Sequence, residues 1–105
     1  MDTGQTNLGF MRVNKAHTEF LKQTVTSLLP GASVFLFGSR VHDDRKGGDI
    51  DLLVLGTRRL TAQEKRSTKI AFYKKFGEQK LDIVSLEWDE PSSFRDFVLQ
   101  EAMQL

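Results

Sequence analysis

Three short apolar runs constrain the fold of this chain more than any other feature. Ser33–Phe37 carries apolar side chains on both faces of an extended strand, which is typical of a strand that is covered on both sides. Ile50–Leu55, which Gly56 ends, and Leu81–Leu86 are two further apolar strands of similar length. The chain is therefore expected to form one α/β layer structure around a small sheet.

Helical patterns separate these runs. Residues 12–29 carry apolar side chains at helical spacing, and Pro30 ends the pattern. A capping-box pattern predicts a second helix from Thr61 to about Phe76, with Gly77 as its C-terminal stop.

A last helix is expected to open at Pro91 and to carry Phe94, Phe97, Val98 and Met103. With a short helix after the first strand, the predicted order is α-β-α-β-α-β-α. This order predicts a small mixed β-sheet with flanking helices.

Length and composition favour one domain. The chain has 105 residues, of which 39% are hydrophobic, and a net charge of +1. Residues 1–9 are expected to form a loose tail and residues 10–105 a single domain. The absence of cysteine excludes disulfides and thiolate metal sites. No apolar run is long enough to cross a bilayer and no signal peptide is recognisable, so we expect a cytoplasmic protein without a membrane partner.

Two carboxylates at the start of the second strand carry the strongest chemical signal. Asp49 and Asp51 stand two positions apart, so both side chains point to the same face of a strand. Two such charges about 4 Å apart repel by roughly 4 kcal/mol at an effective dielectric of 20, a cost that a small domain does not carry for packing. Mg²⁺ turns this repulsion into binding, because it prefers oxygen ligands and exchanges its waters for phosphate oxygens. The pair predicts a two-ion Mg²⁺ site for phosphoryl or nucleotidyl transfer.

Gly38, Ser39 and Arg40 supply a complementary phosphate site. A glycine directly after a buried strand lets the backbone turn sharply and approach a ligand closely. A short helix starting at Ser39 would aim free N–H groups at an anion. The Ser39 hydroxyl could add a hydrogen bond to a β- or γ-phosphate. Arg40 could reach the same phosphates or pair with Asp43 and Asp44.

These positions fix part of the topology. Gly38 ends the first strand and Asp51 begins the second, so a shared triphosphate requires antiparallel strands. Asp82 begins the third strand, which must run parallel to the second to reach the same site. The helix between them is then a right-handed crossover. Asp82 would be a third metal ligand, or the general base that takes the proton of the attacking hydroxyl.

The stretch from Gly38-Ser39-Arg40 through Gly48-Asp49-Ile50-Asp51-Leu52 resembles the signature of the DNA polymerase β-like nucleotidyltransferase superfamily. It looks most like the minimal nucleotidyltransferase (MNT) antitoxin of HEPN/MNT toxin–antitoxin pairs. The resemblance implies Mg²⁺-dependent transfer of AMP from ATP to a protein hydroxyl, with a tyrosine of a HEPN ribonuclease toxin as the expected acceptor.

By the same resemblance, Gly38 and Ser39 would hold the triphosphate, with Arg40 beside them. Asp49 and Asp51 would hold the metals, and Asp82 would occupy the third acidic place. Larger relatives carry an additional helical domain that holds the base and the acceptor. This chain stops at Leu105 without one, which predicts weak base selectivity or a partner subunit that completes the site.

Two other functions stay open on the sequence alone. One is a catalytically silent antitoxin that neutralises its partner by binding, through the acidic segment from Asp82 to the C-terminus, where six carboxylates face Arg95 alone. The other is a transferase acting on a small molecule. A homo-oligomer is possible.

A basic segment precedes the acidic one and holds eight Lys or Arg between Arg58 and Lys80. Its cations could meet RNA or an acidic protein, but no aromatic side chains alternate with them, so direct nucleic-acid binding is not expected. Trp88 and Tyr73 could stack a base, although packing is the favoured role for both.

Overall fold

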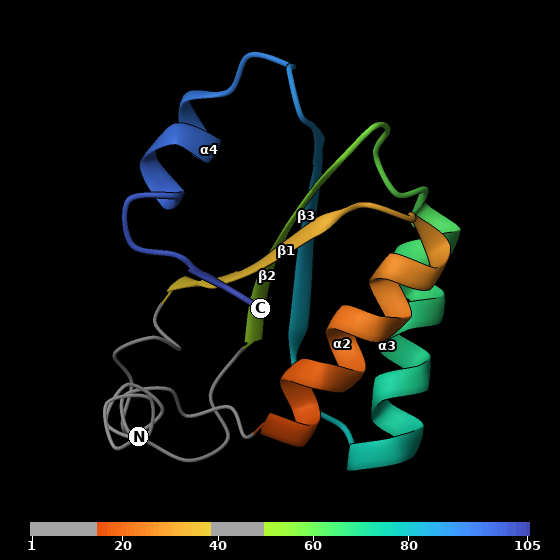
Figure 1. Ribbon diagram of the computed structural model, residues 1–105. Helices are drawn as coiled ribbons and strands as arrows, with labels where there is room; N and C mark the ends of the chain where they lie inside the picture. Colours follow the sequence, from red (N-terminus) through yellow and green to blue (C-terminus); the bar gives the residue numbers. More distant parts are fainter. Residues whose placement is uncertain (1–14, 39–49) are drawn as a thin grey trace.

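The computed structural model describes residues 15–38 and 50–105. In chain order the elements are α2 (Lys15–Leu28), β1 (Ser33–Phe37), β2 (Ile50–Gly56), α3 (Ala62–Phe76), β3 (Leu81–Glu87), α4 (Ser93–Val98) and β4 (Met103–Gln104) (Figure 1). The expected tail over 1–9, the first residues of the expected first helix and the expected helix at Ser39 lie outside the described residues.

The four strands form one mixed sheet in the order β3-β2-β1-β4. β1 is antiparallel to both β2 and β4, whereas β2 and β3 are parallel. α3 makes the crossover between the two parallel strands. The strand orientations that the shared site required, and the small mixed sheet with flanking helices, are confirmed.

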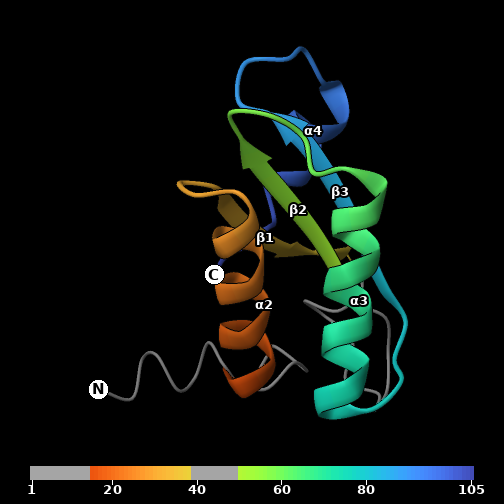
Figure 2. The same ribbon diagram turned by 90° about the vertical axis from the view of Figure 1, so that its right-hand side faces the viewer.

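Two helices cover one face of the sheet. α2 and α3 lie next to each other against it, as Figures 1 and 2 show. Leu21 and Val25 of α2 and Phe72 of α3 are fully buried in the main core, together with Leu52 of β2. The apolar residues of both helices and of the strands face each other across the space between the helices and the sheet. This interface therefore holds most of the buried side chains.

The opposite face carries a smaller core under α4. Leu53 and Leu55 of β2 pack there with Val98 of α4, and Phe35 and Phe37 of β1 join them. Figure 1 shows α4 on the side of the sheet away from α2 and α3. The alternation of side chains along β2 explains why this one strand serves both cores.

The capping box at the start of α3 forms as predicted. The Thr61 hydroxyl accepts a hydrogen bond from the Glu64 N–H at 3.0 Å, and the Glu64 carboxylate accepts one from the Thr61 N–H at 2.8 Å. Gly77 caps the other end with its N–H donating to the Tyr73 carbonyl. The helix bounds therefore follow from local chemistry that the sequence displays.

The prediction for the C-terminal segment was wrong in one respect. α4 ends at Val98, and Met103 lies in strand β4 rather than in the helix. Met103 pairs with Leu36, and Gln104 with Phe35, so β4 covers the edge of β1. β4 forms backbone hydrogen bonds with the otherwise exposed edge of β1, which lies far away in the sequence. The helical periodicity of the segment cannot predict such a pairing.

Candidate functional site

The sheet places two of the predicted acids side by side. Asp51 of β2 and Asp82 of β3 are direct partners in the parallel register. Neighbouring strands lie about 4.8 Å apart, and registered partners in a sheet point to the same face. The two carboxylates therefore share one patch at the N-terminal ends of β2 and β3. The side chain of Asp82 is half exposed and Asp51 is partly buried, so the patch is open to solvent.

Gly38 lies directly against the Asp51 carboxylate. Its φ is +86°, a left-handed conformation that side chains rarely adopt. A Cβ built at this position would overlap Oδ2 of Asp51 and stand 3.2 Å from its Cγ. The backbone at the end of β1 can thus approach the carboxylate only because the residue is glycine. The fold thus brings Gly38, Asp51 and Asp82 together at one edge of the sheet.

Two side chains that the sequence did not single out border this patch. Phe37 is the antiparallel partner of Asp51, and its ring makes an edge contact with Phe94 of α4 at a centroid distance of 5.7 Å. Nζ of Lys80 lies 4.0 Å from Oδ2 of Asp82. The Lys80 carbonyl also accepts a hydrogen bond from the Ile50 N–H at 3.0 Å, which ties the start of β2 to the start of β3.

The remaining predicted site residues, Ser39, Arg40 and Asp49, lie outside the described residues. Within residues 15–38 and 50–105, no group of three or more His, Asp or Glu side chains is arranged to hold a metal ion. Asp51 and Asp82 offer oxygen ligands of the kind that Mg²⁺ prefers, and the Asp82 carboxylate is half exposed. The donor chemistry of this pair fits Mg²⁺.

Comparison with known proteins decides the family. The model of the family described as "Polymerase beta, Nucleotidyltransferase" matches residues 19–105, which include Gly38, Asp51 and Asp82. The chain belongs to this nucleotidyltransferase family. No curated protein matches the sequence significantly.

Two solved structures share the fold of this nucleotidyltransferase-family chain. A crystal structure from Shewanella oneidensis has a TM-score of 0.62 and 17% identity, over 89% of this chain and 71% of the other. The second is the tri-AMPylated Shewanella oneidensis HEPN toxin in complex with MNT antitoxin, with a TM-score of 0.53 and 16% identity. It covers 84% of this chain and 70% of the other chain.

The two candidate base-stacking residues of this nucleotidyltransferase-family chain lie away from the acid pair. Trp88 follows the C-terminal end of β3, six residues beyond Asp82, which is about 20 Å along a strand. Tyr73 packs against the main core under α3, on the other face of the sheet. The packing role favoured for Tyr73 is confirmed, and neither ring adjoins Asp51.

Two arginines of the predicted cationic segment form ion pairs in the loop before α3. Arg58 binds Glu64 through two hydrogen bonds of 2.8 and 3.0 Å and donates a third to the Leu28 carbonyl at 3.2 Å. Arg59 makes a two-bond pair with Glu90, whose Nε–Oε1 distance is 2.9 Å. These guanidinium groups join the loop between β2 and α3 to α2, to α3 and to the loop before α4. Both arginines therefore have a structural role.

The same pairs set the pKa values of their carboxylates. Hydrogen bonding to Arg58, supported by the Thr61 N–H, lowers the pKa of Glu64 to about 2. Hydrogen bonding to Arg59, with a further bond from the Glu87 N–H, lowers the pKa of Glu90 to about 2. Both groups lie far from Asp51 and serve the fold rather than the chemistry. No helix among the described residues is long and apolar enough to span a membrane.

Proposed function

We propose that this chain is a Mg²⁺-dependent nucleotidyltransferase that transfers AMP from ATP to a protein hydroxyl, with a HEPN toxin as the acceptor and an antitoxin role as the consequence. The observation that carries the proposal is the registered pair Asp51–Asp82 beside the left-handed Gly38. The family match supports nucleotidyl transfer in general. The structural similarity to the complex of a tri-AMPylated HEPN toxin with an MNT antitoxin supports the choice of AMP and of the partner.

In the proposed reaction, the acceptor hydroxyl oxygen attacks the α-phosphorus of ATP. The new oxygen–phosphorus bond forms as the bond between the α-phosphorus and the bridging oxygen breaks, and pyrophosphate leaves. Asp49, Asp51 and Asp82 would hold Mg²⁺, which when bound offsets the charge of the triphosphate and of the leaving pyrophosphate. In the alternative in which Asp82 is not a metal ligand, this half-exposed carboxylate would be the general base that takes the proton of the acceptor hydroxyl.

Each part of the chain contributes to this chemistry through its position. The Asp51 carboxylate occupies the space that a side chain at Gly38 would need, so glycine lets the backbone lie directly against that carboxylate. Ser39 and Arg40 would bind the β- and γ-phosphates. Lys80, 4.0 Å from Asp82, adds a positive charge beside the carboxylates. Such a charge favours the approach of a polyanion.

The decisive experiment compares ATP labelled at the α position with ATP labelled at the γ position, with Mg²⁺ and a purified HEPN protein from the same genome. Wild type is expected to transfer the α label only, and Asp51→Asn is expected to lower transfer by at least a hundredfold. Glu19→Gln is the matched control, because Glu19 is an exposed acid on α2, which covers the other face of the sheet. Equal transfer by wild type and Asp51→Asn would refute the site assignment.

A second measurement tests the metal site without activity. Mg²⁺ that binds the folded state raises the melting temperature. Wild type is therefore expected to melt at a higher temperature as Mg²⁺ is added, and Asp51→Asn and Asp82→Asn are expected to lose most of that rise. An unchanged response in both variants would place the metal elsewhere.

One specific observation favours a second candidate, an antitoxin that acts by binding alone. Phe97 is 72% exposed on a helix next to the acid face, as expected of a protein-binding surface. Under this candidate the Asp51→Asn variant still neutralises the HEPN toxin although it transfers no label. If Asp51→Asn binds the HEPN toxin normally but no longer neutralises it, the binding-only candidate is rejected.

A further inference from the structure

An exposed apolar surface lies on α4, where a small domain would ordinarily expose polar groups. Phe94 and Phe97 are 45% and 72% exposed, and Leu99, which caps the helix, is 37% exposed. We call these three residues the α4 patch. Phe97 in particular contributes little to the core of this domain, so folding does not explain an aromatic residue there.

The α4 patch connects directly to the candidate active face. The Phe94 ring contacts the Phe37 ring, and Phe37 is the strand partner of Asp51. Phe97 follows Phe94 by three residues, so the two stand on neighbouring positions of one helix face. A macromolecule seated on the α4 patch would therefore reach the edge of the acid pair.

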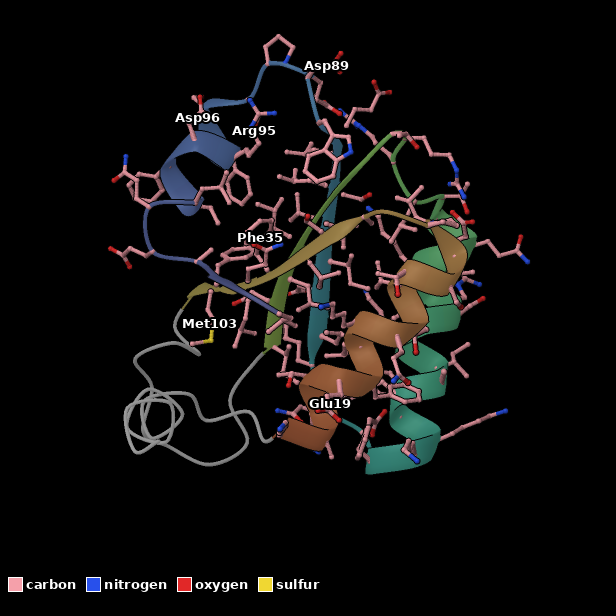
Figure 3. The ribbon with its side chains drawn as sticks, viewed as in Figure 1. Glu19, Phe35, Asp89, Arg95, Asp96 and Met103 are labelled. Atoms are coloured by element: carbon pink, nitrogen blue, oxygen red, sulfur yellow. The ribbon has the colours of Figure 1, made fainter. Side chains whose placement is uncertain are left out.

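The charge around the α4 patch is negative. Asp96 is 70% exposed and lies on the outer side of α4, and Asp89 is exposed in the preceding turn (Figure 3). The basic residue of this helix, Arg95, is only 15% exposed, and it donates to the carbonyls of Trp88 and Glu90 at 3.0 and 2.7 Å. The Arg95 Nε also donates to Oδ1 of Asp96 at 3.3 Å, and of this pair the carboxylate is the exposed member. The exposed charges of the rim, on Asp96 and Asp89, therefore complement a basic surface.

We infer that the α4 patch docks the acceptor protein. The complementary surface of the acceptor would have an apolar centre and a basic rim. This inference rests on the proposed function, because an enzyme that modifies a protein hydroxyl must hold that protein beside its acids. Apolar anchors at the centre of an interface supply most of its affinity, and complementary rim charges mainly speed association. Phe97 would be the anchor and Asp96 a rim charge.

The test measures the affinity of a purified HEPN protein from the same genome for four forms of the full chain. Phe97→Ser is expected to weaken binding by at least tenfold, and Asp96→Lys is expected to slow association and to reduce its salt dependence. Ile70→Ser is the control, because Ile70 is likewise an exposed large apolar residue, 45% exposed, but lies on α3, across the sheet. It is expected to bind like wild type. Phe97 is mostly solvated, so its variant should keep the wild-type melting temperature.

Several outcomes would overturn the inference. These are wild-type affinity in Phe97→Ser, an equal loss in Ile70→Ser, no binding by wild type, or a Phe97-dependent self-association seen by sedimentation without the HEPN protein. Binding and label transfer are measured separately, so the docking inference can fail independently of the proposed chemistry. Phe97-dependent binding without transfer of the α label would reject the chemistry and keep the docking surface. Label transfer that Phe97→Ser leaves unchanged would keep the chemistry and reject the docking surface.

Discussion

Replacing Gly38 with alanine tests how tightly the end of β1 is built against the acid pair. Two separate costs are expected. The first is backbone strain, because φ is +86° and a left-handed conformation costs an alanine about 1–2 kcal/mol. The second is steric, because the new Cβ would overlap Oδ2 of Asp51 and stand 3.2 Å from Cγ. Relieving that overlap requires Asp51 to rotate or the strand end to shift.

Gly31 separates these two costs. Its φ is +84°, and a Cβ there would meet nothing within 4 Å, so Gly31→Ala carries the strain alone. Overpacking costs about 1–3 kcal/mol, and the low end applies because the carboxylate of Asp51 can turn away. Gly38→Ala is therefore expected to lower the free energy of unfolding by about 2–3 kcal/mol, against about 1–2 kcal/mol for Gly31→Ala.

Urea titration followed by circular dichroism measures both variants, and a double-mutant cycle with Asp51→Ala isolates the overlap. That substitution removes the two overlapping atoms and leaves only Cβ, which lies at an ordinary 3.4 Å. In its background, Gly38→Ala should cost no more than Gly31→Ala. If Gly38→Ala costs the same as Gly31→Ala in the wild-type background, the close approach of β1 to Asp51 is wrong. Nucleotidyl transfer should fall in Gly38→Ala even at full folding, because the carboxylate is displaced.

Three further predictions concern the rest of the fold. Thr61→Ala removes the hydroxyl of the capping box and should lower the free energy of unfolding by about 1 kcal/mol, measured by urea titration. Ser85→Ala should cost about 1–3 kcal/mol in the same assay, because the buried Leu60 N–H loses its 2.7 Å acceptor. The pKa of Glu64 is lowered from 4.5 to about 2, so the stabilisation by its pair with Arg58 is complete above pH 4.5 and is lost as the pH falls through 2. Glu64→Gln should make the urea midpoint less dependent on pH in that window.

Matched controls sharpen these three measurements. Ser27→Ala alters an exposed serine at the end of α2 and should change stability by less than about 0.5 kcal/mol. A Ser85→Ala variant as stable as Ser27→Ala would contradict the role of that hydroxyl. Thr61→Ser keeps the capping oxygen and should stay close to wild type. An unchanged pH dependence in Glu64→Gln would show that the pair with Arg58 does not form in solution.

Much of the fold follows from patterns that the sequence displays locally. The three apolar strands, the α3 helix and both of its caps were predictable because strand periodicity, a capping box and a C-terminal glycine each act over a few residues. The relative directions of β1, β2 and β3 also followed, because a common site for Gly38, Asp51 and Asp82 permits only one arrangement. The chemical identity of the site likewise depended on residue types and short spacings.

The tertiary structure decided what depends on contacts between distant residues. The sequence could bring Asp82 to the same edge as Asp51, but only strand pairing made them direct partners and placed Phe37 opposite. Met103 followed a helical pattern, yet the exposed edge of β1 offered it hydrogen bonds that a longer α4 would not supply. The pairs Arg58–Glu64 and Arg59–Glu90 give two of the eight cations of the basic segment a carboxylate partner within the domain. Except for Arg58 and Glu64, which are six residues apart, the partners lie outside the window in which propensity and periodicity act, so the packed chain as a whole decides them.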